Sequence, residues 1–187
     1  MTQRPDPRPE AARTALAEAM VRLVSREECT AKVSVSALCA EAGVSRPTFY
    51  RHFKSVDEVL AYAIQMRLES LTSSLPPDED FHTAEPPEAL VQIMTEVWRE
   101  RPLYRQVLRP SSPYATAKQT AQSWVEEALA AELGADVRTN TRAVFAAGGV
   151  LAFLSMLVES DDLNDEGLRS IVEEFFSIMT TLAPKSN

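Results

Sequence analysis

The sequence predicts an all-α fold, and three features of its composition support this. Five glycines stand against twelve prolines, and the prolines cluster at 5–9, 76–87 and 102–113, so they divide the chain into segments. The segments between them are rich in Ala, Leu, Glu and Arg, which favour helix. No run of alternating β-branched and polar residues is long enough to indicate a sheet. We therefore expect a three-helix head followed by a helical body.

The first helix is predicted over residues 10–27, after a polar and proline-rich start. Its apolar residues recur at helical spacing and form one stripe, as an amphipathic helix requires. This stripe consists of Leu16, Ala19, Met20, Leu23 and Val24.

A helix-turn-helix is predicted immediately afterwards. Ser34 is a suitable N-cap for a short helix, and Gly43 ends that helix because glycine adopts a left-handed conformation at low cost. Ser45 can cap the next helix, whose first turn tolerates Pro47. The apolar residues of this motif are expected to form a common core with the first helix. They are Leu38, Cys39, Val44, Phe49 and Phe53.

The body is expected to contain six further helices, with Ser55 capping the first of them. Proline-rich or polar breaks separate these helices. They are predicted over residues 56–75, 88–100, 102–108, 114–133, 137–159 and 166–182.

The distribution of charge favours a DNA-binding head, although the net charge of the whole chain is −8. Residues 1–54 contain nine Lys and Arg against six Asp and Glu, whereas the remainder contains ten against twenty-one. A basic unit that is joined to an acidic body can orient toward phosphates. We predict a helix-turn-helix domain at 1–54 and a ligand-binding and dimerisation domain at 55–187.

The second helix of the motif carries the predicted DNA contacts. Arg46, Arg51 and His52 are candidate base readers, since arginine donates bidentately to guanine. Phosphate contacts are expected from polar side chains nearby, and Arg13 is a further candidate. A solvated helix face is the alternative interpretation of these residues. The full predicted set is Ser34, Ser45, Arg46, Pro47, Thr48, Tyr50, Arg51, His52 and Lys54.

The body offers candidates for an effector pocket. Aromatic side chains and methionines line apolar ligand sites, but they also fill ordinary cores. The predicted ligand-binding residues are Trp98, Tyr104, Tyr114, Trp124 and Phe145, with Met66, Met94 and Met156 nearby. An apolar or amphipathic small molecule is the expected partner.

The last two helices are the predicted dimer interface. The segment 144–158 is mostly apolar, and two mid-helix glycines would be explained by close helix approach. Packing in an ordinary core is the alternative. The predicted interface residues are Gly148, Gly149, Ala152, Met156, Phe175, Ile178, Met179 and Leu182.

Several other functional classes find little support. With two histidines and no metal-binding Cys spacing, no catalytic residue, metal or cofactor is expected. Phosphate-binding loops and nucleophile elbows do not occur in the sequence. The polar start lacks the pattern of a signal peptide and no apolar run spans a bilayer, so we expect a cytoplasmic protein with reduced thiols.

Residues 35–60 resemble the tetracycline-repressor (TetR) family of bacterial regulators. The resemblance rests on the string from Leu38 to Ser55, with its Ala-Gly-Val-Ser turn, Thr-Phe-Tyr and His-Phe at fixed spacing. Two positions depart from the family pattern. Val56 stands where a lysine is usual, which removes one expected contact with the DNA backbone. Cys39 stands where alanine is usual.

The resemblance implies a homodimeric repressor whose two heads read the half-sites of a palindrome in double-stranded DNA. It also implies that a ligand in the body spreads the heads and releases the operator. Two alternatives stay open: a DNA-binding regulator without a small-molecule inducer, and a helical enzyme or interaction module.

Overall fold

The computed structural model describes residues 8–26, 32–73, 85–133 and 141–182, and within these ranges the chain forms helices and no strands. The prediction of an all-α fold is confirmed. The helices are α1 Arg8–Val24, α2 Val35–Ala42, α3 Arg46–His52, α4 Val56–Ser73, α5 Glu88–Arg99, α6 Arg101–Leu108, α7 Ala115–Leu133, α8 Thr141–Glu159 and α9 Asp165–Leu182.

Several predicted helix bounds differ from the structure by one to three residues or, like the predicted end at 75, fall outside the described residues. The first helix was expected to reach residue 27, but α1 ends at Val24. The predicted start of the penultimate helix at 137 falls outside the described residues, and α8 begins at Thr141.

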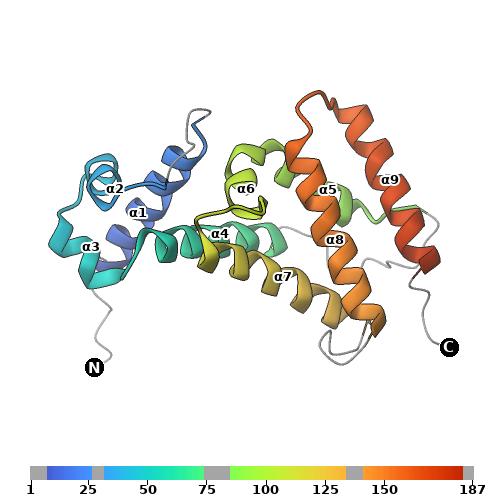
Figure 1. Ribbon diagram of the computed structural model, residues 1–187, viewed down its shortest axis with the longest axis horizontal. Helices are drawn as coiled ribbons and strands as arrows, with labels where there is room; N and C mark the ends of the chain where they lie inside the picture. Colours follow the sequence, from blue (N-terminus) through green and yellow to red (C-terminus); the bar gives the residue numbers. More distant parts are fainter. Residues whose placement is uncertain (1–7, 27–31, 74–84, 134–140, 183–187) are drawn as a thin grey trace.

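The three helices of the head pack as the sequence predicts. Leu16, Met20 and Val24 of α1 are fully buried, and they share a core with Leu38 of α2 and Phe49 of α3. Cys39 and Phe53 are buried in the same cluster, and Val44 packs against it from the turn. Figure 1 shows these helices gathered at one end of the molecule.

Local capping explains why the chain turns where it does. The Ser34 side chain accepts a hydrogen bond from the Ala37 N–H at 3.1 Å, which begins α2. Gly43 has φ +66° and ψ +28°, and the following Val44 N–H donates to the Cys39 carbonyl at 3.0 Å. This left-handed residue ends α2 and directs the chain into α3.

Helix α4 connects the head to the body. Ser55 Oγ accepts from the Glu58 N–H at 3.2 Å, and Glu58 in turn accepts from the Lys54 N–H at 2.7 Å, so both side chains cap the helix. Val56, at the position of the family's lysine, is buried. The helix runs from the head into the body, where it packs against α1 on one side and α7 on the other (Figure 1).

Helices α5 to α9 form the body around this connection. α8 packs against α5, α6 and α7, and α9 lies against α5 and α8. Most buried residues of head and body belong to one continuous hydrophobic cluster. None of the described helices is long and apolar enough to cross a membrane.

The left-handed residue of the turn gives a test of the head. Gly43→Ala should destabilise the protein by about 1–2 kcal/mol, because a Cβ disfavours this backbone conformation while meeting no atom within 4 Å. Gly43→Asn is the matched control and should cost less, since Asn tolerates the left-handed region. Urea unfolding monitored by circular dichroism measures both. Equal stability of Gly43→Ala and the parent would contradict the assignment.

Candidate nucleic-acid interface and apolar cavity

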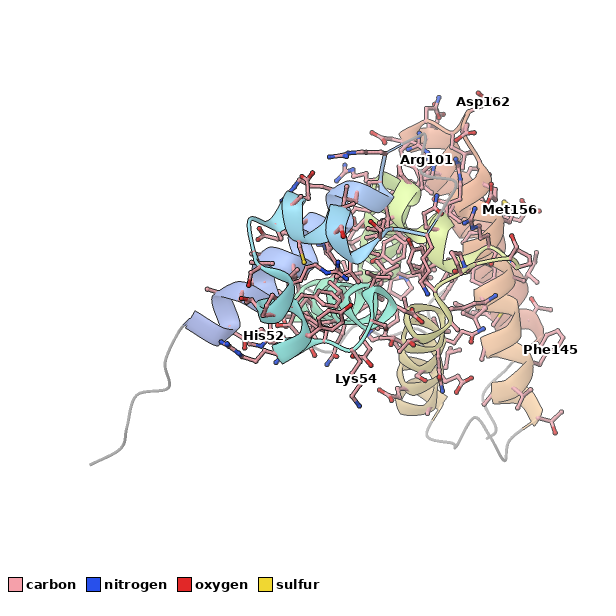
Figure 2. The ribbon with its side chains drawn as sticks, turned by 60° about the vertical axis from the view of Figure 1, so that its left-hand side comes forward. His52, Lys54, Arg101, Phe145, Met156 and Asp162 are labelled. Carbon is pink, nitrogen blue, oxygen red and sulfur yellow. The ribbon has the colours of Figure 1, made fainter. Side chains whose placement is uncertain are left out.

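Helix α3 is held by buried aromatic side chains on one side and is exposed to solvent on the other. Phe49 is fully buried and Phe53 nearly so, and their ring centroids lie 6.4 Å apart. Between them Tyr50 is 54% exposed and Arg51 is also exposed. His52 is half-buried, and Figure 2 shows it with Lys54 at the outer edge of the head. The predicted DNA-binding side chains of α3 therefore share a face that the core does not occupy.

The cations of this face have no carboxylate partners among the described residues. No ion pair there involves Arg46, Arg51 or Lys54. Arg22 on α1 and Arg26 just after it differ, because both bond Glu41 of α2, at 3.0 and 2.8 Å. Their hydrogen bonds lower the pKa of the Glu41 carboxyl. Arg22 and Arg26 thus connect the first helix region to α2, while the arginines of α3 remain available to phosphates or bases.

Hydroxyl groups mark the beginnings of the two motif helices. Ser45 Oγ accepts from the Thr48 N–H at 3.2 Å and lies 2.8 Å from the Thr48 hydroxyl. Ser45 and Pro47 are exposed, and Thr48 is half-buried. Ser34 is exposed at the start of α2. Helix N-termini carry free N–H groups and a positive dipole end, which suits them to phosphate oxygens.

Arg13 lies at the joint between α1 and α4. Its guanidinium sits 4.2 Å from the centroid of the Tyr62 ring and 3.8 Å from a Glu10 oxygen. The Tyr62 hydroxyl donates to Glu10 at 2.8 Å, and burial together with this carboxylate raises the pKa of Tyr62. A phosphate would have to compete with these partners for Arg13.

A buried carboxylate joins α4 to the start of α7. Asp57 is 8% exposed, and its Oδ2 accepts from the Thr116 N–H at 2.9 Å and from the Thr116 hydroxyl at 2.8 Å. Its Oδ1 accepts from the Ala117 N–H at 3.1 Å. A carboxylate at a helix N-terminus satisfies free N–H groups and interacts favourably with the dipole. Asp57, four residues after the motif ends at Phe53, thereby caps a helix of the body.

A second hydrogen bond links the body to the head. Tyr114 is fully buried directly before α7, and its hydroxyl oxygen accepts from the Val33 N–H at 3.0 Å. Val33 immediately precedes the N-cap of α2. The beginning of α7 is therefore bonded to the connecting helix α4 through Asp57 and to the head through Val33.

An apolar cavity of about 250 Å³ lies inside the body, between α4 and the five helices that follow. No charged residue lines it, and the polar side-chain groups on its wall are the Tyr104 hydroxyl and the Trp124 indole. Burial raises the pKa of Tyr104, which keeps the phenol neutral. The wall consists of Leu68, Leu90, Ile93, Met94, Val97, Tyr104, Leu108, Ala121, Trp124, Val125, Ala128, Leu129, Val150, Leu151, Leu154, Phe175, Phe176 and Met179.

The structure brings two of the five predicted ligand-binding aromatics to this cavity, Tyr104 and Trp124. The other three lie elsewhere. Trp98 stacks with Arg101 and donates to the Ser160 carbonyl, Tyr114 sits at the junction with the head, and Phe145 is 56% exposed on α8. The aliphatic part of the wall was not predicted, because Leu, Ile and Val at helical spacing look the same in any core.

The predicted interface residues also divide into two groups. Gly148, Ala152 and Met156 are exposed on α8, and Ile178 is exposed on α9. Phe175 and Met179 line the cavity, with Phe175 stacked 4.0 Å from Phe153. A Cβ at Gly149 would lie 3.3 Å from Met179 Sδ, so this glycine permits close approach of α8 and α9 within the chain. The side chain of Leu182 lies outside the described residues.

Residues 26–63, from the end of α1 to the middle of α4, match the family described as bacterial regulatory proteins, tetR family. The head of the chain is thus a DNA-binding segment of the tetR family, and the protein is a DNA-binding transcriptional regulator rather than an enzyme. In the described part of the chain, no three His, Cys, Asp or Glu side chains are grouped to hold a metal ion.

Solved structures of other regulators share the fold of this chain. A transcriptional regulator from Rhodococcus sp. RHA1 is 21% identical, covers 94% of this chain and 99% of its own, and has a TM-score of 0.64. A TetR regulator from Streptococcus agalactiae 2603V is 17% identical, with 92% and 95% covered and a TM-score of 0.66. The fatty acid degradation regulator FadR from Bacillus halodurans is 15% identical, with 98% of both chains covered and a TM-score of 0.58. Curated protein sequences give no significant match.

The Asp57 cap gives a test of the junction between α4 and α7. Asp57→Asn should destabilise the protein by about 1–3 kcal/mol, because an amide presents one acceptor and a mismatched donor to the three groups that now bond the carboxylate. Asp161→Asn is the matched control, since Asp161 is exposed and pairs with Arg105 at the surface. Thermal unfolding compares the two. A larger loss for Asp161→Asn would contradict the role of Asp57.

Proposed function

We propose that the protein is a homodimeric repressor that binds a palindromic operator through α3 and leaves it when a small molecule enters the apolar cavity. The observation that carries this proposal is the exposed cationic face of α3 within the segment that matches the tetR family. The proposed domains are a head at 1–54 and a ligand-binding and dimerisation body at 55–187.

Base reading is assigned to Arg46, Arg51 and His52, which lie on the outer side of α3. A short helix in the major groove places its N-terminal half against base edges, where arginine distinguishes guanine. Phosphate contacts are assigned to Ser34, Ser45, Thr48, Tyr50 and Lys54, with Pro47 close to the backbone. These contacts would set the register of the head and supply salt-dependent affinity.

The dimer interface is assigned to an exposed apolar stripe on α8. Phe145, Gly148, Ala152 and Met156 repeat every three or four residues, and Figure 2 shows Phe145 and Met156 projecting from the same outer side of this helix. Phe145 and Met156 are 56% and 45% exposed, and Ile178 of α9 is 48% exposed. Contiguous apolar surface of this kind favours association with a second copy.

Coupling between cavity and head is assigned to α7. Trp124 and Val125 in its middle line the cavity, and its beginning is bonded to Asp57 and lies next to Tyr114. A ligand that shifts α7 would therefore move α4 and the loop before α2 together. By linkage, the ligand must bind the released form more tightly by the factor that it weakens DNA binding.

A regulator without an inducer is the second candidate, and a cavity too small for a ligand would favour it. The volume of about 250 Å³ exceeds the roughly 150 Å³ that suffices for benzene. The regulator from Bacillus halodurans, described as acting in fatty acid degradation, also suggests an effector with an alkyl chain.

Selection of randomised duplex DNA on the purified protein tests the proposal directly. A palindrome should be enriched, and Arg46→Ala and Arg51→Ala should each weaken binding to it by roughly 10- to 100-fold, the effect of losing one bidentate base contact. Arg99→Ala, an exposed cation of the body, is the control and should leave affinity unchanged. Absence of enrichment at low salt would refute DNA reading by this head.

Sedimentation of a variant of the α8 stripe tests the dimer. Ala152→Arg places a charge on an exposed position, so it should convert a dimer to monomers while leaving the helical content unchanged. Gln92→Arg on the exposed side of α5 is the matched control and should remain dimeric. A dimer that survives Ala152→Arg would place the interface elsewhere.

A further inference from the structure

A polar depression on the surface adjoins the apolar cavity. It lies between α4 and α7, has a volume of about 450 Å³, and shares Leu68 and Trp124 with the cavity wall. We call this depression the vestibule. The cavity and the vestibule therefore adjoin each other at the side chains of Leu68 and Trp124.

The two spaces differ in chemistry. The cavity wall carries no charge, so it suits an alkyl or aromatic group. The vestibule presents the carboxylates of Glu69 and Glu127, together with polar groups such as the amides of Gln65 and Gln119. Gln65 donates to Glu69 at 2.8 Å, which holds that carboxylate on the α4 side.

No basic side chain lines the vestibule. The two basic residues close to it in sequence are directed to other partners. Arg67 pairs with Glu100, and Lys118 donates to the Arg109 carbonyl at 3.5 Å. The electrostatic character of the vestibule is therefore set by two acids and neutral hydrogen-bonding groups.

We propose that the effector is a cationic amphiphile whose apolar part fills the cavity and whose ammonium or amidinium end occupies the vestibule. This inference rests on the proposed effector-controlled function. Opposite charges at the vestibule attract, and the indole of Trp124 at the boundary offers a further surface that favours a cation. A carboxylate end would lie beside two like charges without a basic partner, which disfavours a free fatty acid.

Three probes with the same ten-carbon tail show how much the polar end contributes to binding affinity. They are decyltrimethylammonium, decanol and decanoate, each used below its micelle concentration. Trp98 lines neither space, so a Trp98→Phe protein leaves Trp124 as the fluorescent reporter. Decyltrimethylammonium should bind about tenfold or more tightly than decanoate, with decanol between them. The preference should shrink as salt is raised.

Matched variants identify the source of the preference. Glu69→Gln with Glu127→Gln should bring the three affinities within about twofold of one another by removing both charges. Glu88→Gln with Glu96→Gln removes two acids of α5 that lie outside the vestibule, and it should retain the preference. Leu151→Trp fills the cavity and should weaken all three probes together.

The outcomes separate this inference from the proposed function. Three results would each overturn the inference. Decanoate could bind as tightly as the ammonium probe, the Glu69→Gln, Glu127→Gln protein could keep the full preference for the ammonium probe, or none of the three probes could bind. Operator binding is measured in parallel by fluorescence anisotropy. If the ammonium probe binds with the expected preference but releases no operator, the ligand class stands and the inducer mechanism falls.

Discussion

The arrangement of this protein depends on α4, which is buried on two sides at once. One side packs against α1 in the head and the other against α7 in the body. Its one buried ionisable residue, Asp57, would be costly in such a place if it lacked partners. Three hydrogen bonds from the start of α7 satisfy its carboxylate and fix the position where that helix begins. The same contact that stabilises the carboxylate thus joins the two parts of the molecule.

Charge is distributed so that each part has a separate role. Arg22 and Arg26 are paired with Glu41 inside the head, while the arginines of α3 have no carboxylate partners among the described residues. In the body, two glutamates line the vestibule, and ion pairs such as Arg105 with Asp161 connect α6 to the loop after α8. An acidic body is repelled by phosphates, which favours approach of the head to DNA.

Prediction from sequence succeeds for the head and is partial for the body. In the head, every signal is local: a Ser that caps, a Gly that turns and aromatics four residues apart. In the body, Tyr104 and Trp124 reach the cavity, while Phe145, on a helix that is apolar on almost every side, faces outward. Helical periodicity cannot select one face of such a helix.

The sequence by itself determined the helices, their caps, the turn at Gly43 and the face of α3 that stays outside the core. Each of these follows from interactions between residues at most five positions apart. The tertiary structure decided which apolar side chains enclose the cavity, that Gly149 admits Met179, and that Asp57 caps α7 across 59 or 60 residues. Those outcomes depend on how whole helices pack, and packing joins residues that no local pattern connects.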